Sequence, residues 1–416
     1  MLSQGLINTE LQSPVRKAFN FYAVLFSLNH ATVTTPLVFS TSLLGAPANI
    51  GNGVLFVCTL LSALFCGTAL VGSFGPLKSS VVAMGLYTVY VTGFACCCLQ
   101  PDSALVPVAF GALSAVGGLG AGILWTSQGA VFASASRVIA TDEGVTSEAV
   151  TAELGARFAS LYLACEVIAK ASVTGLKLAT PLSITYIWSI VFFLYAFVAA
   201  LSTLLANRCV DLQSRPEPGP LLGKAMAAVE LMPDVRVWLL SFTNLTFGFC
   251  AAFMNGYVNE HYVKESTVFN ETAIGFLTAI TAVVAGLSAP VFARLSKRFG
   301  KGWVVFFGSL AFMTIPLCVI FAYVDTWGVG IILFFVLHGL GRGVYESTNK
   351  VAFADFFPGK APGAFANCMM QNSFAFAVCF FLSAAFQSQP SVLAGIVLTL
   401  AALTGPSYAL AAASSP

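Results

Sequence analysis

Four ionisable side chains recur every four residues within one apolar stretch: His338, Arg342, Glu346 and Lys350. Residues at i and i+4 lie on the same side of an α-helix, so all four are predicted to share one face. A charged residue at the centre of a membrane-spanning helix costs roughly 2.5–3.5 kcal/mol, so this face should line the protein interior or water. It is our first candidate for binding a charged solute or carrying a proton. The alternative is a structural ladder of salt bridges, Arg342 with Glu346 and Glu346 with Lys350, in which Lys350 only reaches to the interface.

A second charged pair, Glu166 and Lys170, has the same spacing in an earlier apolar stretch. We expect the two side chains to pair, either as a static strut or as a lock that a substrate or proton can open. If transport is coupled to protons, the candidate titrating groups are Glu166, His338 and Glu346.

Uncharged polar residues extend this candidate site along other apolar stretches. They are Asn29 and His30, which precede Pro36, then Trp125 and Gln128, and finally Asn244 and Asn255. Proline lacks an N–H group, so Pro36 can interrupt its helix within the membrane. For any single Asn, hydrogen bonding between neighbouring helices is the alternative interpretation.

These residues must be positioned by membrane-spanning helices. The 416 residues are 58% hydrophobic and 9% charged, whereas a soluble domain carries about 25% charged residues. Apolar runs of the length needed to cross a bilayer recur along the chain. They are predicted near 18–40, 53–73, 80–100, 104–135, 156–179, 183–206, 237–258, 272–293, 302–323, 328–350, 364–386 and 391–412. The sequence therefore predicts an all-α membrane protein with twelve transmembrane helices.

Other classes of function find little support in the residues. The eleven cysteines form no CxxC pair and no cluster with zinc-ligand spacing. No Walker loop, catalytic triad or paired-carboxylate constellation is present, and no basic cluster interleaved with aromatics suggests a nucleic-acid partner. We therefore expect neither an enzyme nor a cofactor, and partners limited to membrane lipid, a small solute or ion, and another membrane protein.

The basic residues predict the orientation of the chain. With the N-terminus in the cytoplasm, 15 of the 19 Lys and Arg residues fall in cytoplasmic segments or flanks, as the positive-inside rule requires. Both termini are then cytoplasmic, in either the plasma membrane or an endomembrane. The glycosylation sequon that begins at Asn270 falls in an outer loop, consistent with this orientation.

The chain also reads as two related halves. Residues 118–123 (GLGAGI) match residues 339–344 (GLGRGV), and residues 126–128 match 347–349, which end in Asn349. Two six-helix halves related by an axis along the membrane normal suit a transporter. The predicted organisation is a tail (1–17), an N-terminal half (18–206), a Pro-rich cytoplasmic linker (207–236), a C-terminal half (237–412) and a tail (413–416).

Several of these motifs resemble a known family. Residues 120–129, 339–349 and 363–367 resemble the Unc-ninety-three-like branch of the major facilitator superfamily, and residues 290–300 resemble the superfamily's basic gating loop. The resemblance implies two pseudo-symmetric six-helix bundles, and a cavity lined by the first, fourth, seventh and tenth helices. It also implies a gating role for Arg294, Lys297 and Arg298. The equivalent loop at 72–78 lacks the acidic residue of that motif.

Two functions remain open from the sequence. The branch implies solute or ion transport for some members and regulation of channels or receptor trafficking for others. The buried charges of the fifth and tenth helices favour a secondary transporter with alternating access, because an adaptor has no need for charges in its core. The alternative is a non-transporting regulator or trafficking adaptor of another membrane protein.

Overall fold

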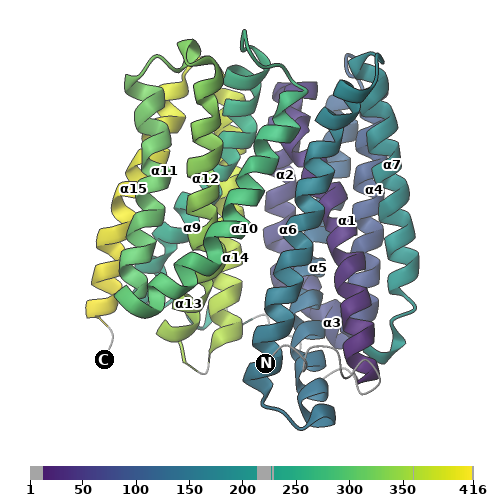
Figure 1. The fold of residues 1–416 in the computed structure, drawn as a ribbon, viewed down its shortest axis with the longest axis vertical. Coiled ribbons are helices and arrows are strands. Elements are labelled where there is room, and N and C mark those ends of the chain that lie inside the picture. Colours follow the sequence, from purple (N-terminus) through teal and green to yellow (C-terminus); the bar gives the residue numbers. More distant parts are fainter. Residues whose placement is uncertain (1–12, 213–225, 227–228, 359, 415–416) are drawn as a thin grey trace, which may run out of the picture.

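A computed structural model describes residues 13–212, 226, 229–358 and 360–414. Long helices lie side by side in one bundle, and α1 begins at the same end of the bundle at which α15 ends (Figure 1). This end is called the terminal end below, and the opposite end is called the distal end. In Figure 1 the helices of the N-terminal half lie on the right and those of the C-terminal half on the left.

Six long helical rods make up each half. The N-terminal half contains α1 (Pro14–Leu44), α2 (Ala46–Leu61), η1 (Ser62–Gly67), α3 (Thr68–Phe74), α4 (Pro76–Leu99), α5 (Val106–Glu143), α6 (Ser147–Ala179) and α7 (Ile184–Ala206). The C-terminal half contains α9 (Val235–Phe253), η3 (Met254–Lys264), α10 (Ala273–Phe299), α11 (Lys301–Phe321), α12 (Ile332–Val344), η6 (Tyr345–Asn349), α13 (Lys350–Phe356), α14 (Ala361–Ala385) and α15 (Pro390–Ala413). Short 3-10 turns, η2 (Val210–Leu212), η4 (Val324–Thr326) and η5 (Gly328–Ile331), complete the described elements.

Eleven of the described rods are long and apolar enough to cross a membrane, which makes the chain an integral multi-pass membrane protein. The remaining rod, α1, has 31 residues and is also long enough. Its hydropathy is lower because it carries Asn20, Asn29, His30 and several threonines. Asn29 and His30 are buried against other helices, so lipid does not contact them.

Two rods extend further at the terminal end than hydropathy predicts. The fourth and fifth spans are predicted to end near 135 and to begin near 156, whereas α5 runs to Glu143 and α6 begins at Ser147. A span predicted from hydropathy ends where charged residues begin, but the helix itself can continue beyond the membrane into water. Arg16 of α1 donates to Glu143 over 2.7 Å and to Glu153 over 2.7 Å, and these ion pairs hold the extension against α1.

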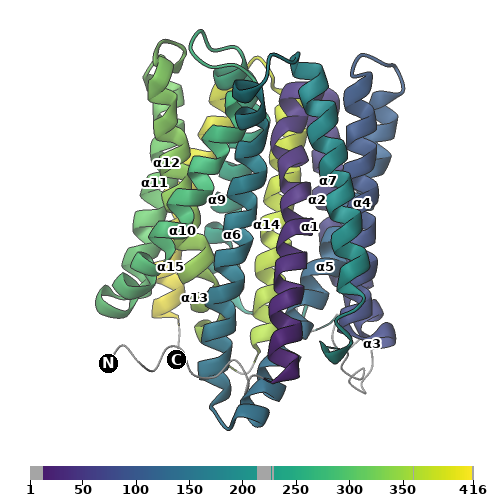
Figure 2. The same ribbon diagram turned by 45° about the vertical axis from the view of Figure 1, so that its right-hand side comes forward.

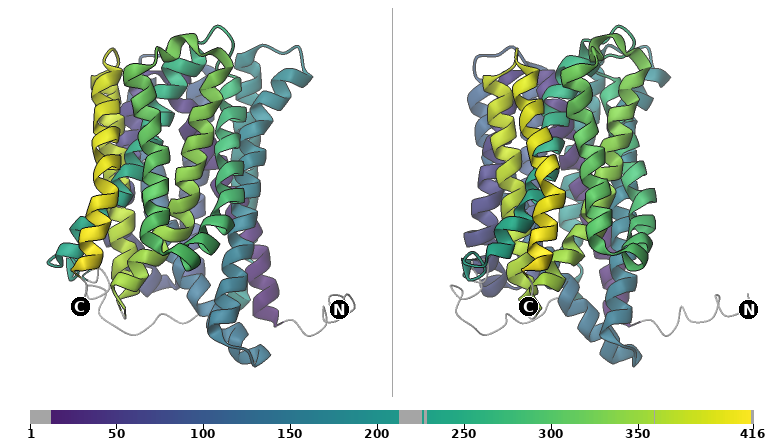
Figure 3. Two further views of the ribbon diagram at one scale, coloured as in Figure 1. Left: turned by 60° about the vertical axis from the view of Figure 1, so that its left-hand side comes forward. Right: turned by 90° about the vertical axis from the view of Figure 1, so that its left-hand side faces the viewer.

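The largest contacts between the two halves involve three pairs of elements. Helix α2 packs against α14, α6 packs against α10, and α1 packs against η3. Figure 2 shows α6 and α1 side by side near this seam. Figure 3 shows α15, in yellow, on the outside of the C-terminal half. The Pro-rich part of the predicted linker, residues 215–220, lies outside the described residues.

The matched glycine motifs occupy equivalent positions in the two halves. A Cβ atom on Gly118 would lie 2.2 Å from the backbone oxygen of Leu55 in α2, so α5 and α2 are in backbone contact there. In the second half, a Cβ atom on Gly339 would lie 2.8 Å from the backbone oxygen of Thr281 in α10. The motif in each half therefore lets its helix approach the second rod of the same half closely.

The turns after the second and eighth rods are also equivalent. Gly75 has φ 81° and ψ 163°, and Gly300 has φ 91° and ψ 151°. Only glycine adopts this backbone region readily. The two loops that resemble each other in sequence thus share one backbone conformation, which supports the pseudo-symmetry of the fold.

Candidate functional site

Glu166, Lys170 and Arg342 form an ion cluster in the interior of the bundle. Arg342 donates from Nη1 to Glu166 Oε1 over 2.7 Å and from Nη2 to Oε2 over 2.8 Å. Lys170 Nζ donates to the same Oε1 over 2.6 Å. Glu166 and Lys170 belong to α6, whereas Arg342 belongs to α12, so the cluster links the two halves.

This cluster is largely shielded from water. Glu166 is 2% exposed and Lys170 is 6% exposed, while the Arg342 side chain is 11% exposed. Glu166 lies 13 residues before the end of α6, which corresponds to a depth of about 20 Å. Removing one partner of a buried ion pair costs about 3–5 kcal/mol because the other charge is left unpaired. The cluster therefore favours the arrangement of the halves seen here.

The pairing within the cluster matches the sequence-based expectation only in part. The pairing of Glu166 with Lys170 is confirmed. The alternative salt-bridge ladder paired Arg342 with Glu346, but the bidentate partner of Arg342 is Glu166. Glu346 does interact electrostatically with Arg342, and the side chain of Lys350 lies outside the described residues.

A change of helix type interrupts the expected face of the tenth rod. The π-helical turn η6 begins at Tyr345, directly after α12 ends at Val344. A π-helix has an i→i+5 hydrogen-bond pattern, so residues beyond Val344 leave the α-helical register. The prediction of one continuous face assumed a regular α-helix, and that assumption fails from Tyr345 onward.

An aromatic cluster surrounds His30 in the N-terminal half. The His30 ring lies 5.2 Å from Trp125 and 5.2 Å from Tyr162, centroid to centroid, and stacks on Phe26 at 6.0 Å. Tyr87 lies 5.9 Å away on α4. The cluster thus brings together side chains from α1, α4, α5 and α6, and it places two predicted site residues, His30 and Trp125, in direct contact.

Tyr162 connects the aromatic cluster to the ion cluster. Its hydroxyl lies 3.4 Å from His30 Nε2, and it precedes Glu166 by one turn of α6. It also interacts electrostatically with Arg342. Tyr162 is not among the predicted site residues, although its i, i+4 spacing from Glu166 was a usable signal.

His338 lies one turn before Arg342 on α12 and is 7% exposed. Its ring lies 6.0 Å from that of Phe312. Within the described part of the chain, neither His338 Nε2 nor His30 Nδ1 has a hydrogen-bond partner. Each half therefore holds a buried histidine close to the central charges, with one ring nitrogen available.

Asn244 and Asn349 belong to a hydrogen-bonded chain inside the C-terminal half. Asn349 Nδ2 donates to Asn244 Oδ1 over 2.8 Å, and Asn244 Nδ2 donates to Gln371 Oε1 over 2.7 Å. Gln371 Nε2 in turn donates to the backbone oxygen of Val237. These contacts connect η6, α9 and α14, as interhelical hydrogen bonding predicts.

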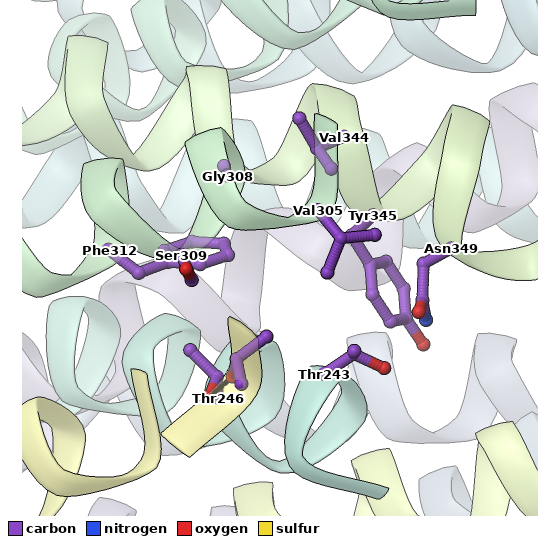
Figure 4. Close-up of a pocket in the computed structure, with 11 residues that line it drawn as sticks. Thr243, Thr246, Val305, Gly308, Ser309, Phe312, Val344, Tyr345 and Asn349 are labelled. Atoms are coloured by element: carbon purple, nitrogen blue, oxygen red, sulfur yellow. Dashed lines mark hydrogen bonds between the residues drawn. The ribbon is translucent and has the colours of Figure 1, made fainter. Parts of the chain in front are cut away.

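A small cavity adjoins this chain. It has a volume of about 20 Å³ and its lining includes Thr243, Tyr345 and Asn349, and Figure 4 shows Tyr345 and Asn349 extending toward Thr243. A space of this size holds about one water molecule. The residues that line the cavity all belong to the C-terminal half and include none of the three residues of the ion cluster.

The other predicted polar residues are more dispersed. Asn29 Nδ2 donates to the backbone oxygen of Ala199 over 3.1 Å, which joins α1 to α7. Asn255 accepts a hydrogen bond from Thr41 Oγ1 over 2.6 Å through its backbone oxygen. Gln128 is half-buried on α5, three residues after Trp125.

At the distal end, further hydrogen bonds join the halves. Lys264 Nζ donates to the backbone oxygen of Ser42 over 2.7 Å, and Asn259 Nδ2 donates to that of Val38 over 3.4 Å. Together with the contact between Thr41 and Asn255, they tie the end of α1 to η3. This contact was not predicted, because it depends on the π-helical form of η3, which exposes different residues than an α-helix would.

The predicted loop residues lie at opposite ends of the bundle. Arg294, Lys297 and Arg298 are exposed at the terminal end, near the end of α10. Asn270 is exposed at the distal end, and its Oδ1 accepts a hydrogen bond from the Thr272 backbone over 3.0 Å. The described residues contain no group of three or more His, Cys, Asp or Glu side chains that could hold a metal ion.

Comparison with solved structures shows the same architecture elsewhere. A variant of the nucleoside transporter NupG superposes with a TM-score of 0.71, covering 96% of this chain and 100% of that one at 12% identity. The chain has the fold of the Major Facilitator Superfamily. The xylose transporter XylE from E. coli superposes with a TM-score of 0.63 at 15% identity, covering 97% of both chains. A bacterial homologue of the human drug peptide transporters PepT1 and PepT2 reaches 0.65 at 11% identity, covering 96% of this chain and 97% of that one.

Sequence comparison supports the same family. Residues 237–413 match the model of the Major Facilitator Superfamily. Protein unc-93 homolog A from Mus musculus is 24% identical over 187 residues, which are 44% of this chain and 39% of that relative. The predicted resemblance to the superfamily and to its Unc-ninety-three-like branch is thereby confirmed.

Proposed function

We propose that the chain is a secondary transporter that moves a small solute or ion across a membrane by alternating access. The moving parts are the N-terminal half (18–206) and the C-terminal half (237–412), joined by the linker 207–236. The fold shared with nucleoside, sugar and peptide transporters supports this proposal. The match to the superfamily model supports it further.

The observation that carries the proposal is the buried ion pair between Glu166 and Arg342. It joins the halves at a depth in the membrane at which charged side chains are energetically costly. Charged residues at such a depth are usually functional, so we assign this pair a role in transport. Since the two residues belong to different halves, rocking of the halves about the centre must separate or reorient them. A charged solute or a proton that competes for either partner would then promote this movement.

Access in the present conformation is proposed to be from the terminal end. The hydrogen bonds of Thr41, Asn259 and Lys264 tie α1 to η3 at the distal end. Phe56 of α2 also stacks on Phe376 of α14, with ring centroids 4.2 Å apart. Opening the distal end requires these contacts to break, which identifies them as the distal gate.

The terminal end is proposed to face the cytoplasm. The excess of Lys and Arg in the flanks at this end favours that orientation, and it leaves Asn270 outside as a glycosylation candidate. The exposed Arg294, Lys297 and Arg298 then form the cytoplasmic gating loop. Proton coupling would use Glu166, His338 or Glu346, which all belong to or adjoin the ion cluster.

We propose no catalytic role and no cofactor. The buried ionisable groups pair with one another across helices, and this arrangement suits a conformational contact better than it suits bond breaking. A regulator or trafficking adaptor of another membrane protein is the alternative function. It would leave the central ion pair without a purpose beyond folding.

Uptake into reconstituted vesicles separates the two functions. Purified protein is placed in vesicles and tested with labelled amino acids, sugars, nucleosides and cations, and protein-free vesicles serve as the blank. Transport predicts uptake of at least one class above the blank. No uptake of any class, by protein that remains folded, would favour the adaptor.

A further inference from the structure

We propose that the central site takes a small aromatic monocarboxylate, with its ring against Trp125 and Tyr162 and its carboxylate on Arg342. This inference rests on the proposed transport function, because it names the class of solute that the same site would carry. Three features of the site support it: the partial exposure of some of its aromatic rings, the unused hydrogen-bond donors of Arg342, and the short distance between the rings and Arg342.

The aromatic cluster has a buried layer and an accessible layer. Phe26 and Tyr87 are 0% and 3% exposed and form the buried layer behind His30. Trp125, Phe158 and Tyr162 are only half-buried. The rings of Trp125 and Tyr162 lie 6.0 Å apart at 71°, and those of Phe158 and Tyr162 lie 6.5 Å apart and nearly parallel. The accessible layer thus offers ring faces and edges to a planar ligand, which aromatic pairs favour.

The central charges are not equally available to a ligand. Glu166 accepts hydrogen bonds on both oxygens from Arg342 and Lys170 and is 2% exposed, so it is fully engaged. Arg342 is the most exposed of the three. A guanidinium carries five N–H donors, of which Arg342 uses two on Glu166. The group that can still form hydrogen bonds with a ligand is therefore the Arg342 guanidinium. Because it is a cation, it favours an anionic group on the ligand.

The same three residues carry one negative and two positive charges, so the cluster itself has a formal charge of +1. One carboxylate neutralises a charge of +1, whereas a ligand with two negative charges would leave an excess negative charge in the interior.

The ring layer and the cationic group are close enough for one small molecule. Tyr162 and Glu166 are four residues apart on α6, a rise of about 6 Å, and Arg342 is bonded directly to Glu166. His30 Nδ1, which has no partner among the described residues, adds a further hydrogen-bonding group beside the rings. One ring bearing one carboxylate matches this spacing.

The proposal is tested by measuring ligand binding to purified wild-type protein in detergent. Four probes are used, a reference and three competitors that each differ from it in one property. Labelled benzoate is the reference, and benzamide, cyclohexanecarboxylate and benzylammonium are its competitors. Benzamide lacks the charge, cyclohexanecarboxylate lacks the aromatic ring, and benzylammonium reverses the charge. We expect benzoate to bind, and each competitor to bind about tenfold or more weakly.

Variants locate the binding site. Trp125→Ala should weaken benzoate binding about tenfold while changing cyclohexanecarboxylate binding much less, because it removes an aromatic partner. Trp303→Ala, at an exposed tryptophan of α11, is the matched control and should bind as the wild type does. Arg342→Lys should also weaken benzoate binding, since lysine lacks the fork geometry of arginine.

The outcomes separate this inference from the proposed function. If vesicles take up sugars or nucleosides while benzoate does not bind, the inference is overturned and transport stands. If benzoate binds as expected but vesicles take up neither labelled benzoate nor any solute of the panel, the ligand class stands and transport fails. Equal binding of benzamide or benzylammonium, or a Trp125→Ala variant that binds benzoate as the wild type does, also overturns the inference.

Discussion

Arg342 of α12 donates hydrogen bonds to both carboxylate oxygens of Glu166 of α6, over 2.7 and 2.8 Å, across the seam between the two halves. The two residues are 176 positions apart in the chain. Both are charged groups inside a bundle that faces lipid, and each is the principal partner of the other. This one contact therefore stabilises the present arrangement of the halves, and in the proposed function it also couples their movement.

Glu166→Gln should lower the stability of the folded protein strongly. The substitution leaves Arg342 and Lys170 as two neighbouring buried cations without a carboxylate between them. The expected loss is about 3–5 kcal/mol in the free energy of unfolding. Adding Arg342→Gln should recover part of that loss, because it removes one of the two unpaired charges.

Thermal unfolding in detergent measures these changes. Glu153→Gln is the control, because Glu153 pairs with Arg16 at the terminal end and its side chain is 56% exposed. An exposed pair is worth about 0–1 kcal/mol, so this variant should unfold near the wild-type temperature. A Glu166→Gln protein as stable as the control would contradict the structural account of the cluster.

Gly275→Ala should destabilise the contact between α6 and α10. An added Cβ atom would lie 2.1 Å from the backbone oxygen of Lys170, so the two helices would have to move apart. Overpacking of this kind costs about 1–3 kcal/mol. Gly395→Ala in α15 is the matched control, since nothing lies within 4 Å of the added atom. Thermal unfolding of the two variants should differ clearly, and equal stability would show that the seam is looser than described.

A covalent link across the distal gate should block transport. Lys264 Nζ donates to the Ser42 backbone oxygen over 2.7 Å, but a lysine side chain reaches further than a disulfide spans. The double variant Ser42→Cys, Lys264→Cys is therefore linked with a reducible bifunctional thiol reagent. It should lose vesicle uptake when linked and regain it on reduction, because alternating access requires this end to open. The single variants, treated with the same reagent, control for the native cysteines. Undiminished uptake by the fully linked double variant would mean that the distal contact does not open during transport.

Asn270 should carry a glycan when the chain is made in cells that glycosylate. The residue is exposed at the distal end, opposite the basic terminal end, and the sequon places Thr272 two residues later. Asn270→Gln should then increase mobility on a gel, as should treatment of the parent protein with a glycosidase. A glycan that remained on Asn270→Gln, or modification of a tag at either terminus instead, would reverse the proposed orientation.

Local spacing was enough to predict part of the site. The pairing of Glu166 with Lys170 follows from an i, i+4 interval within one regular helix. The glycine motifs of the fourth and tenth rods were recognised as equivalent, and in the structure each faces the second rod of its half. Composition and apolar run lengths were likewise sufficient for the membrane class and the helical fold.

The rest of the site depends on contacts that one sequence does not encode in its spacing. Glu166, the partner of Arg342, lies in the other half of the molecule, and no regular spacing in the sequence relates the two residues. The π-helical turn η6 shifts the register after Val344, so a face drawn for an ideal α-helix fails there. Asn29, expected near the central cavity, instead bonds to α7, because which side of α1 meets which neighbour is set by packing of the whole bundle.

Solute flux in vesicles tests the central claim most directly. The solute that the wild type takes up best is measured with wild type, Arg342→Ala, Glu346→Gln and the control Glu153→Gln, each confirmed to be folded and inserted. Transport through the ion cluster predicts that Arg342→Ala and Glu346→Gln lose uptake by about 100-fold or more, the factor that corresponds to roughly 3 kcal/mol, while Glu153→Gln keeps it. Undiminished uptake by both central variants would contradict the assignment of this cluster as the transport site.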